Sequence, residues 1–171
     1  KELNILKNHL NTSRVVTQMH FGGGTPTYFA PEQLEEVINA VKEIFPNFAP
    51  DAEVSCEVDP RYFTVEHMNV LKAGGCNRLS FGVQDLDEEV QKTIHRIQPF
   101  ELTQNVINIA RNAGIHSVNT DLIYGLPHQT RESFKKTLEK MLTLNTDRFA
   151  VFNYAHVPWL MKTMRKFDES T

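Results

Sequence analysis

The sequence predicts an α/β fold in which about five parallel strands form part of a (βα)6 barrel. Short apolar strands alternate with amphipathic helices, and a polar or glycine-rich cluster follows each strand. The clusters begin at positions 22, 57, 82, 121 and 153, and the intervals of 35, 25, 39 and 32 residues suit βα units. An open sheet usually gathers its ligand groups at one switch point, whereas a barrel draws them from every strand onto one rim. This distribution favours the barrel.

Each βα unit is bounded by local signals. The first expected helix carries apolar residues at 3.6-residue spacing from Leu34 to Ile44, and Gly74 and Gly114 follow two later helices as C-terminal caps do. Strands joined through helices give a parallel sheet with right-handed crossovers. The predicted strands are 15–21, 52–58, 77–81, 116–123 and 148–152, and the predicted helices are 31–45, 65–73, 88–94, 102–112 and 131–142.

Composition limits the class of protein. With 171 residues and 40% hydrophobic content, the chain can bury one core, so we treat residues 1–171 as a single domain. A net charge of -3 argues against a nucleic-acid surface or a polybasic membrane patch. No apolar run approaches the roughly 20 residues that span a bilayer, and the start lacks a signal-peptide h-region. We therefore expect a cytoplasmic protein with no nucleic-acid or membrane partner.

The chain has two cysteines, Cys56 and Cys76, and contains neither CxxC nor CxxxCxxC. Their spacing suggests no disulfide framework and no metal knuckle, so we expect reduced, buried thiols and predict no metal ligand.

Three consecutive glycines, Gly22 to Gly24, follow the first strand and leave bare backbone that could approach a ligand. The same glycines could equally form only a tight turn. Glu57 and Asp59 follow the second strand and could cap the following helix, and because Asp59 precedes a proline, capping is the expected role of Asp59.

The later clusters also allow structural interpretations. Gln84 and Asp85 could satisfy neighbouring backbone groups, and Arg96 could simply favour a helix dipole. Asp121 lies within an apolar strand, where a carboxylate is costly unless it is paired or solvated, and this favours a functional role. His20 and His156 flank the clusters, but solitary histidines are more often structural, and we assign no catalytic residue.

The motifs GGGTPT, EVDP, GVQD, DLIYGLP and FNYAH, in this order between Val15 and Trp159, resemble the oxygen-independent coproporphyrinogen III oxidases (dehydrogenases) of the radical S-adenosylmethionine superfamily. A heme-chaperone group of the same superfamily is less similar, because it typically has EANP and a GVQS-like sequence at the second and third motifs. The resemblance implies a radical-SAM-type barrel.

The resemblance also implies cofactor-binding roles. Gly23, Gly24 and Thr25 would take the amino and carboxylate groups of one S-adenosylmethionine, Glu57 would contact the same molecule, and Ala155 would offer backbone to its adenine. A second S-adenosylmethionine would be held by Gln84, Arg96 and Asp121, which supply donors and acceptors for a zwitterion.

The activity implied is oxidative decarboxylation of two propionates of coproporphyrinogen III to vinyls in heme biosynthesis, with a 4Fe-4S cluster and an unidentified electron donor. A substrate with four carboxylates suits cationic partners. The candidates are Arg61, Arg78, Arg96 and Arg165, which the sequence does not rank. The full-length form is expected to be a monomer.

The chain departs from the family pattern because it has no cluster motif. We therefore expect an interior fragment, inactive alone, in which the first strand with its cluster loop and a C-terminal region are absent. One alternative is a heme-binding or heme-transfer relative. Another is a phosphate-binding α/β enzyme that uses the glycines as an anion nest, although GxxxxGK[ST] and GxGxxG are both missing.

Overall fold

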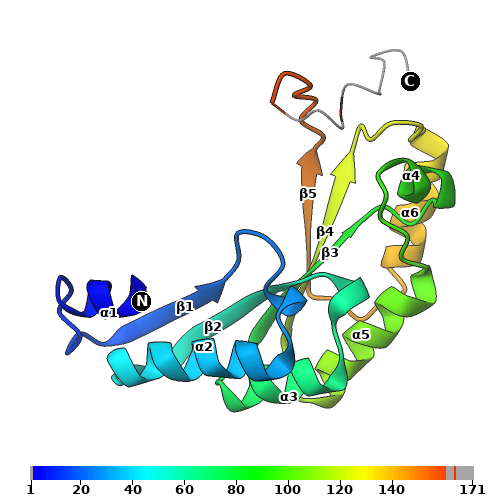
Figure 1. The fold of residues 1–171 in the computed structure, drawn as a ribbon. Helices are drawn as coiled ribbons and strands as arrows, with labels where there is room; N and C mark the ends of the chain where they lie inside the picture. The colour runs from blue at the N-terminus through cyan, green and yellow to red at the C-terminus, as the bar shows by residue number, and fades with distance from the viewer. Residues whose placement is uncertain (1, 161–163, 165–171) are drawn as a thin grey trace.

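A computed structural model describes residues 2–160 and Met164, and it shows a parallel sheet that curves into a half-barrel (Figure 1). The strand order is β1-β2-β3-β4-β5, and every neighbouring pair is parallel. The predicted fold class, a partial barrel of about five parallel strands, is confirmed. The strands are β1 Val16–Phe21, β2 Phe48–Val58, β3 Arg78–Gln84, β4 Ser117–Tyr124 and β5 Arg148–Asn153.

Helices connect successive strands, and α2, α3, α5 and α6 lie along the convex side of the sheet (Figure 1). The helices are α1 Glu2–Lys7, α2 Pro31–Ile44, α3 Val65–Ala73, α4 Glu88–Thr93, α5 Phe100–Asn112 and α6 Arg131–Met141, with 3-10 turns η1 Pro26–Tyr28 and η2 Pro60–Tyr62. Strong periodicity and capping residues made the long helices predictable.

The sequence did not indicate α1, the 3-10 turns or the early start of β2. The six residues of α1 bury no side chain, so they carry no apolar stripe. β2 begins at Phe48, although Pro50 argues against a regular strand there. Its pairing with β1 is irregular over this stretch, between Val16 and Gln18, which accommodates a residue without an amide hydrogen.

The core lies between the convex face of the sheet and the helices. In β3, Leu79, Phe81 and Val83 are buried, whereas the residues between them are only partly covered. Since successive side chains of a strand point to opposite faces, the apolar set faces the helices and the polar set faces the concave interior. The concave face is therefore free to carry polar chemistry.

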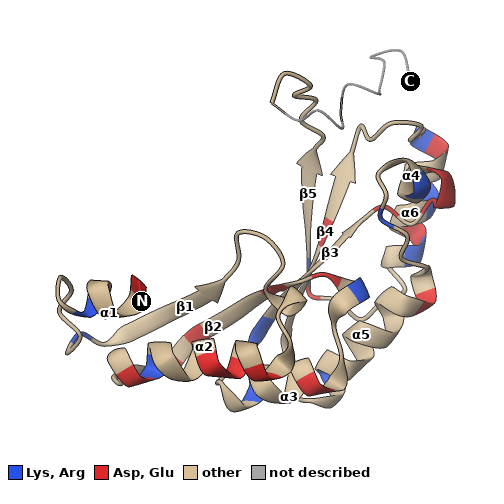
Figure 2. Cartoon of the chain, in the orientation of Figure 1, with Lys and Arg blue, Asp and Glu red and all other residues tan. Residues whose placement is uncertain are grey.

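Charges of both signs are interspersed along the helices that cover the convex face (Figure 2). Within the described part of the chain, no helix is both long and apolar enough to cross a bilayer.

Candidate functional site

The carboxyl ends of β1 to β4 surround a polar cavity of about 140 Å³. Six of the eight predicted site residues line it: Gly24, Thr25, Glu57, Gln84, Arg96 and Asp121. Gly23 lines the adjoining cavity of about 280 Å³ at the glycine loop. Ala155 is exposed beyond β5 and lines neither cavity. The fold thus gathers residues that are up to 97 positions apart, from Gly24 to Asp121.

The glycine loop presents bare backbone to open space. Gly23 and Gly24 have φ values of 82° and 153°, a region that strains other residues, and a Cβ on either would meet nothing within 4 Å. The Gly23 amide donates a hydrogen bond to Glu57 Oε2 at 3.3 Å. The loop is therefore a turn whose backbone also faces a cavity, so the turn interpretation and the binding interpretation are compatible.

Gln84 enters the cavity because β3 carries an irregularity at its end. Gly82 pairs with Asp121 and Gln84 pairs with Leu122, so Val83 is an extra residue, and Gln84 adopts a φ of 69°. Such bulges re-aim side chains and are frequent beside active sites. A Cβ on Gly82 would stand 2.9 Å from Gln84 Nε2 and 3.1 Å from Arg96 Nη2, so this glycine leaves room for both side chains.

The Arg96 guanidinium is fixed over the cavity rather than directed at a helix end. Its Nη2 donates to the Gly82 carbonyl at 2.9 Å and pairs with Asp59 Oδ2 at 3.0 Å. Its Nε is buried and has no hydrogen-bond partner among the described residues. The guanidinium therefore keeps one donor that the described residues do not use. Arg96 is thus better placed for a ligand than for a helix dipole.

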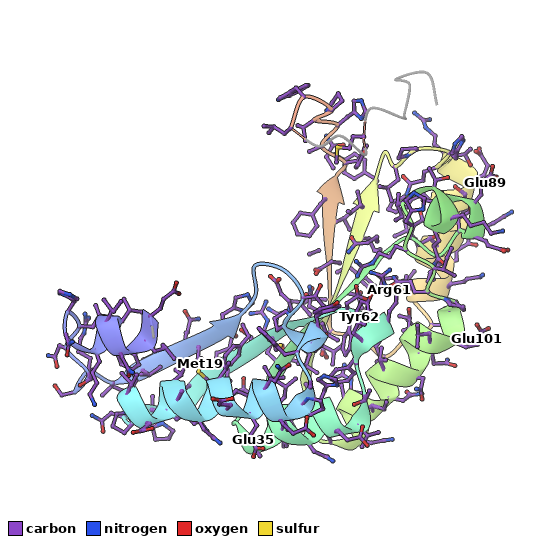
Figure 3. All side chains as sticks on the ribbon, in the orientation of Figure 1. Met19, Glu35, Arg61, Tyr62, Glu89 and Glu101 are labelled. Atoms are coloured by element: carbon purple, nitrogen blue, oxygen red, sulfur yellow. The ribbon has the colours of Figure 1, made fainter. Side chains whose placement is uncertain are left out.

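Asp59 is buried at 4% exposure and holds two arginines. Its Oδ1 accepts from the Arg61 amide at 3.0 Å, which confirms the predicted capping role, although the capped element is the 3-10 turn η2. Burial opposes ionisation of this carboxyl, but the hydrogen bonds of Arg61 and the charges of Arg96 and Arg61 outweigh burial and lower its pKa. Figure 3 shows Arg61 and Tyr62 at this turn. The guanidinium carbon of Arg61 lies 5.4 Å from the centroid of the Tyr62 ring.

Asp121 lies on the concave face, where its side chain and those of Ser80 and Asn119 are all hydrogen-bonded to one another. Ser80 Oγ donates to the carboxylate at 3.0 Å, and Asn119 Nδ2 donates to it at 2.7 Å. Asn119 also donates to Ser80 Oγ at 2.7 Å. Burial raises the pKa of Asp121 in spite of these hydrogen bonds, and the nearby Glu57 charge adds to the increase. Neutral hydrogen-bond donors thus hold this strand carboxylate without removing the cost of its burial.

Asp85 and Arg78, two other residues considered from the sequence, make contacts within the protein that hold the fold. Asp85 is fully buried and accepts hydrogen bonds from Thr137 Oγ1 at 2.6 Å and the Asp87 amide at 2.7 Å, as its structural interpretation required. Arg78 pairs with Glu53 at 3.1 Å and begins β3, away from the rim. Arg165 lies outside the described residues.

Both cysteines are buried and unsuited to ligate iron. Cys56 is 0% exposed and Cys76 is 2% exposed. Burial raises the pKa of both thiols, that of Cys76 to about 11, so neither supplies a thiolate near neutral pH. In the described part of the chain, no three His, Cys, Asp or Glu side chains are grouped as a metal site would require. These residues do not fit a 4Fe-4S cluster.

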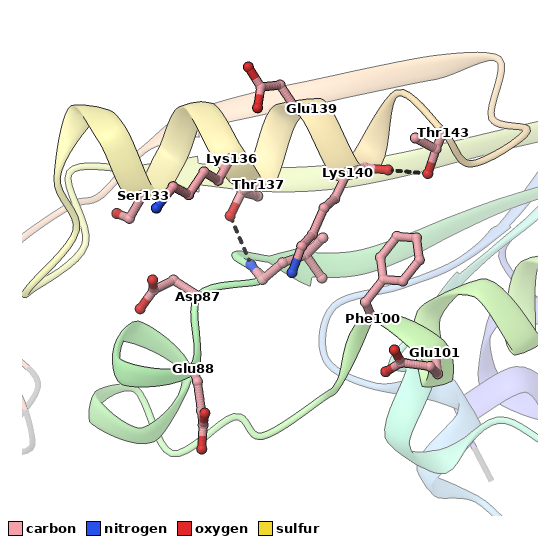
Figure 4. A pocket seen from close by; sticks show the side chains of 11 residues that line it. Asp87, Glu88, Phe100, Glu101, Ser133, Lys136, Thr137, Glu139, Lys140 and Thr143 are labelled. Carbon is pink, nitrogen blue, oxygen red and sulfur yellow. Dashed lines mark hydrogen bonds between the residues drawn. The ribbon is translucent and has the colours of Figure 1, made fainter.

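A larger cavity of about 630 Å³ lies between α6 and the segment that joins β3 to α5 (Figure 4). Lys136 and Lys140 of α6 and Glu88 and Glu101 of the opposite wall line it, and the Leu86 amide donates to Thr137 Oγ1 at 3.2 Å across it. Its lining contains no group drawn from the glycine loop or the concave face. The rim cavity, although smaller, is therefore the better candidate site.

The rim residues fit a small zwitterionic ligand such as the methionine moiety of S-adenosylmethionine. The loop offers backbone groups, Glu57 offers a carboxylate for an ammonium, and Arg96 offers a buried donor without a partner. Donors and acceptors thus face each other across one cavity, as a zwitterion requires.

A parallel half-barrel with converging polar residues at the carboxyl ends of its strands defines a partial barrel whose candidate ligand site lies at that rim. The chain belongs to the radical SAM superfamily, because the model of that superfamily matches residues 3–141.

Individual relatives confirm the resemblance predicted from the motifs. The chain is 63% identical over 170 residues to an oxygen-independent coproporphyrinogen III oxidase of Helicobacter pylori, covering 99% of this chain and 37% of that protein. The structure of coproporphyrinogen III oxidase from Escherichia coli matches with a TM-score of 0.87 and 47% identity, over 92% of this chain and 36% of that one. A radical S-adenosylmethionine methyltransferase from Kitasatospora setae shares the fold at a TM-score of 0.66 and 16% identity, over 82% of this chain and 28% of that one. The chain thus spans little more than a third of its curated relatives.

Sequence patterns did not indicate several contacts at this rim. Ser80 and Asn119 hold Asp121, Asp59 holds Arg96, and His20 contacts Glu57 at 3.4 Å. The alternation of polar and apolar residues in the strands could have placed Ser80 and Asn119 on the concave face. No local signal indicated that Asp59 and Arg96 would meet, because their contact depends on how β2 and the segment after α4 pack together.

Proposed function

We propose that this chain contributes the S-adenosylmethionine-binding part of an oxygen-independent coproporphyrinogen III oxidase. The observation that carries the proposal is the convergence of six predicted ligand residues on one rim cavity, in a chain 63% identical to a protein of that name. In the whole protein, its five strands would form most of a six-stranded barrel. This protein would act in the cytoplasm as a monomer.

Glu57 and the glycine loop would hold the first S-adenosylmethionine. The Glu57 carboxylate would accept hydrogen bonds from the ammonium group, while the backbone of Gly23 and Gly24 and the Thr25 side chain would receive the carboxylate. Ala155 would present backbone groups to the adenine from the end of β5. Its exposure leaves that backbone accessible.

Gln84, Arg96 and Asp121 would hold a second S-adenosylmethionine. Arg96 would donate from the buried Nε that now has no partner, and the Gln84 amide and the Asp121 carboxylate would complete the set of donors and acceptors. Asp59 keeps the guanidinium in place, so Arg96 loses little side-chain entropy when a ligand binds.

S-adenosylmethionine, together with a 4Fe-4S cluster bound by other parts of the whole protein, would supply the one-electron chemistry that converts propionates of coproporphyrinogen III to vinyls. In the balance of this reaction, an electron donor would supply one electron, and an electron acceptor would take up the electron released with carbon dioxide. The residues described here would bind and orient the cofactor and keep water from the rim.

The experiment is a calorimetric titration of the full-length protein with S-adenosylmethionine, combined with an anaerobic assay of carbon dioxide release from coproporphyrinogen III. Binding together with decarboxylation supports the proposal. Titration with heme, run in parallel, distinguishes the heme-transfer alternative, because heme binding without decarboxylation would favour that alternative. A nucleotide that binds while S-adenosylmethionine is ignored would favour the phosphate-binding alternative.

A further inference from the structure

We propose that His20 is a positioning residue that fixes the Glu57 carboxylate against the glycine loop. The inference rests on the proposed function, because Glu57 matters to catalysis only if the loop receives S-adenosylmethionine. It assigns a role to a histidine that the sequence motifs left without one.

His20 bridges two side chains of the neighbouring strand. It pairs with Ser55 in the register of β1 and β2, and Glu57 lies two residues further along β2, on the same concave face. His20 Nδ1 is 2.9 Å from Ser55 Oγ, and His20 Nε2 is 3.4 Å from Glu57 Oε1. The ring therefore lies between a hydroxyl that orients it and a carboxylate that it can orient.

The hydrogen-bond chemistry gives each carboxylate oxygen of Glu57 its own partner. When Nδ1 accepts from the Ser55 hydroxyl, Nε2 carries the proton and faces Glu57 Oε1 at 3.4 Å, a polar contact that becomes an ion pair in the imidazolium form. Oε2 remains for the Gly23 amide at 3.3 Å. Because the Glu57 side chain is 43% exposed, these two contacts select one rotamer from several.

Gly22 gives independent support, because the His20 and Glu57 side chains occupy the space that a Cβ at this position would fill. A Cβ there would collide with the His20 ring and stand 2.9 Å from the Glu57 carboxyl carbon. Both atoms are the ends of side chains, so an alanine would displace the pair rather than the strand backbone. The glycine beside the loop thus serves the His20 and Glu57 contact.

The test is a double-mutant cycle on the affinity of the full-length protein for S-adenosylmethionine, measured by calorimetry. We expect His20→Leu to weaken binding about fivefold, as the loss of a partly exposed polar contact to a charged group does. In a Glu57→Gln background, the same substitution should change affinity less than about twofold, because the group it positions has been altered. Equal losses in both backgrounds would overturn the proposal.

Further variants separate positioning from folding. His20→Gln retains an amide donor and should recover part of the affinity, and Gly22→Ala should reproduce the His20→Leu loss while both polar side chains remain. His116→Leu is the matched control, since His116 is exposed before the start of β4. In kinetics, the His20 variants should raise KM for S-adenosylmethionine more than they lower kcat. If His20→Gln recovers no affinity for S-adenosylmethionine, the positioning role of His20 is contradicted. An unchanged affinity in Gly22→Ala would also contradict it.

A measurement that needs no S-adenosylmethionine tests the positioning role of His20 separately from the proposed function. Hydrogen exchange of the Gly23 amide should be faster in His20→Leu, because its acceptor Glu57 is then less ordered. If the unsubstituted protein binds no S-adenosylmethionine, the proposed function is wrong, and this exchange rate alone decides the positioning role. Unchanged exchange would overturn it.

Discussion

Two carboxyl groups at the rim have pKa values shifted in opposite directions. Asp121 has a raised pKa because burial is only partly offset by Ser80 and Asn119, whereas Asp59 has a lowered pKa because two arginines outweigh its burial. A cationic ligand, as the proposed function requires, would relieve the cost of burying the Asp121 carboxylate. Asp59 already has its partners and serves the structure.

Replacement of Asp121 by asparagine is expected to stabilise the protein while weakening S-adenosylmethionine binding. The raised pKa means that the folded state holds the proton more tightly than the unfolded state. The stability gained from this proton is fully present below the unfolded pKa and is lost as pH rises through the folded pKa. The melting temperature of Asp121→Asn should therefore exceed that of the unsubstituted protein at neutral pH, and the difference should shrink in acid.

Replacement of Asp59 by alanine is expected to destabilise the protein by about 3 kcal/mol, because it leaves Arg96 and Arg61 without their buried partner and removes the η2 cap. Its lowered pKa gives a contribution that is present above the unfolded pKa and is lost as pH falls through the folded pKa. Denaturant unfolding at several pH values measures both effects. Asp51→Ala, at an exposed position of β2, is the control, and an equal loss there would contradict this account.

At the scale of elements, Asp85 joins the end of β3 to α6. Thr137 and Gln129 both donate to this buried carboxyl group from the segment that follows β4. This contact crosses 52 residues of sequence, so it helps to place α6 against the sheet.

Asp85→Ala is expected to cost about 2 kcal/mol in the free energy of unfolding, since it leaves buried donors unsatisfied. Lys135→Ala on the exposed face of α6 removes only an exposed ion pair at 3.8 Å and should change stability little. Urea unfolding of both variants measures their free energies of unfolding, which can then be compared. If Asp85→Ala is as stable as Lys135→Ala, the contact does not hold α6.

The sequence predicted the type of all five strands and of α2 to α6 because local signals agreed there, whereas α1 was not predicted. Apolar periodicity defined α2, and glycines marked the ends of α3 and α5. The start of β2 and the turns η1 and η2 were not predicted, since prolines mark a break in regular structure without saying what replaces it.

At the scale of the whole molecule, the concave face is polar and the convex face is apolar. The cysteines follow this division, because Cys56 and Cys76 both belong to the buried core between sheet and helices. We therefore expect residues 1–171 alone to bind no iron–sulfur cluster after anaerobic reconstitution. Absorption spectroscopy checks this, and an iron–sulfur charge-transfer band would contradict it.

By itself, the sequence determined the class of fold, the superfamily and most of the residues that meet at the rim. It could do so because strand ends, glycine runs and short motifs are local, and the topology of a parallel barrel then brings strand ends together. Only the tertiary structure decided which residues hold the others in place. Asp59 with Arg96, Ser80 and Asn119 with Asp121, and His20 with Glu57 are contacts between separate segments, and their distances depend on register and packing that no local pattern encodes.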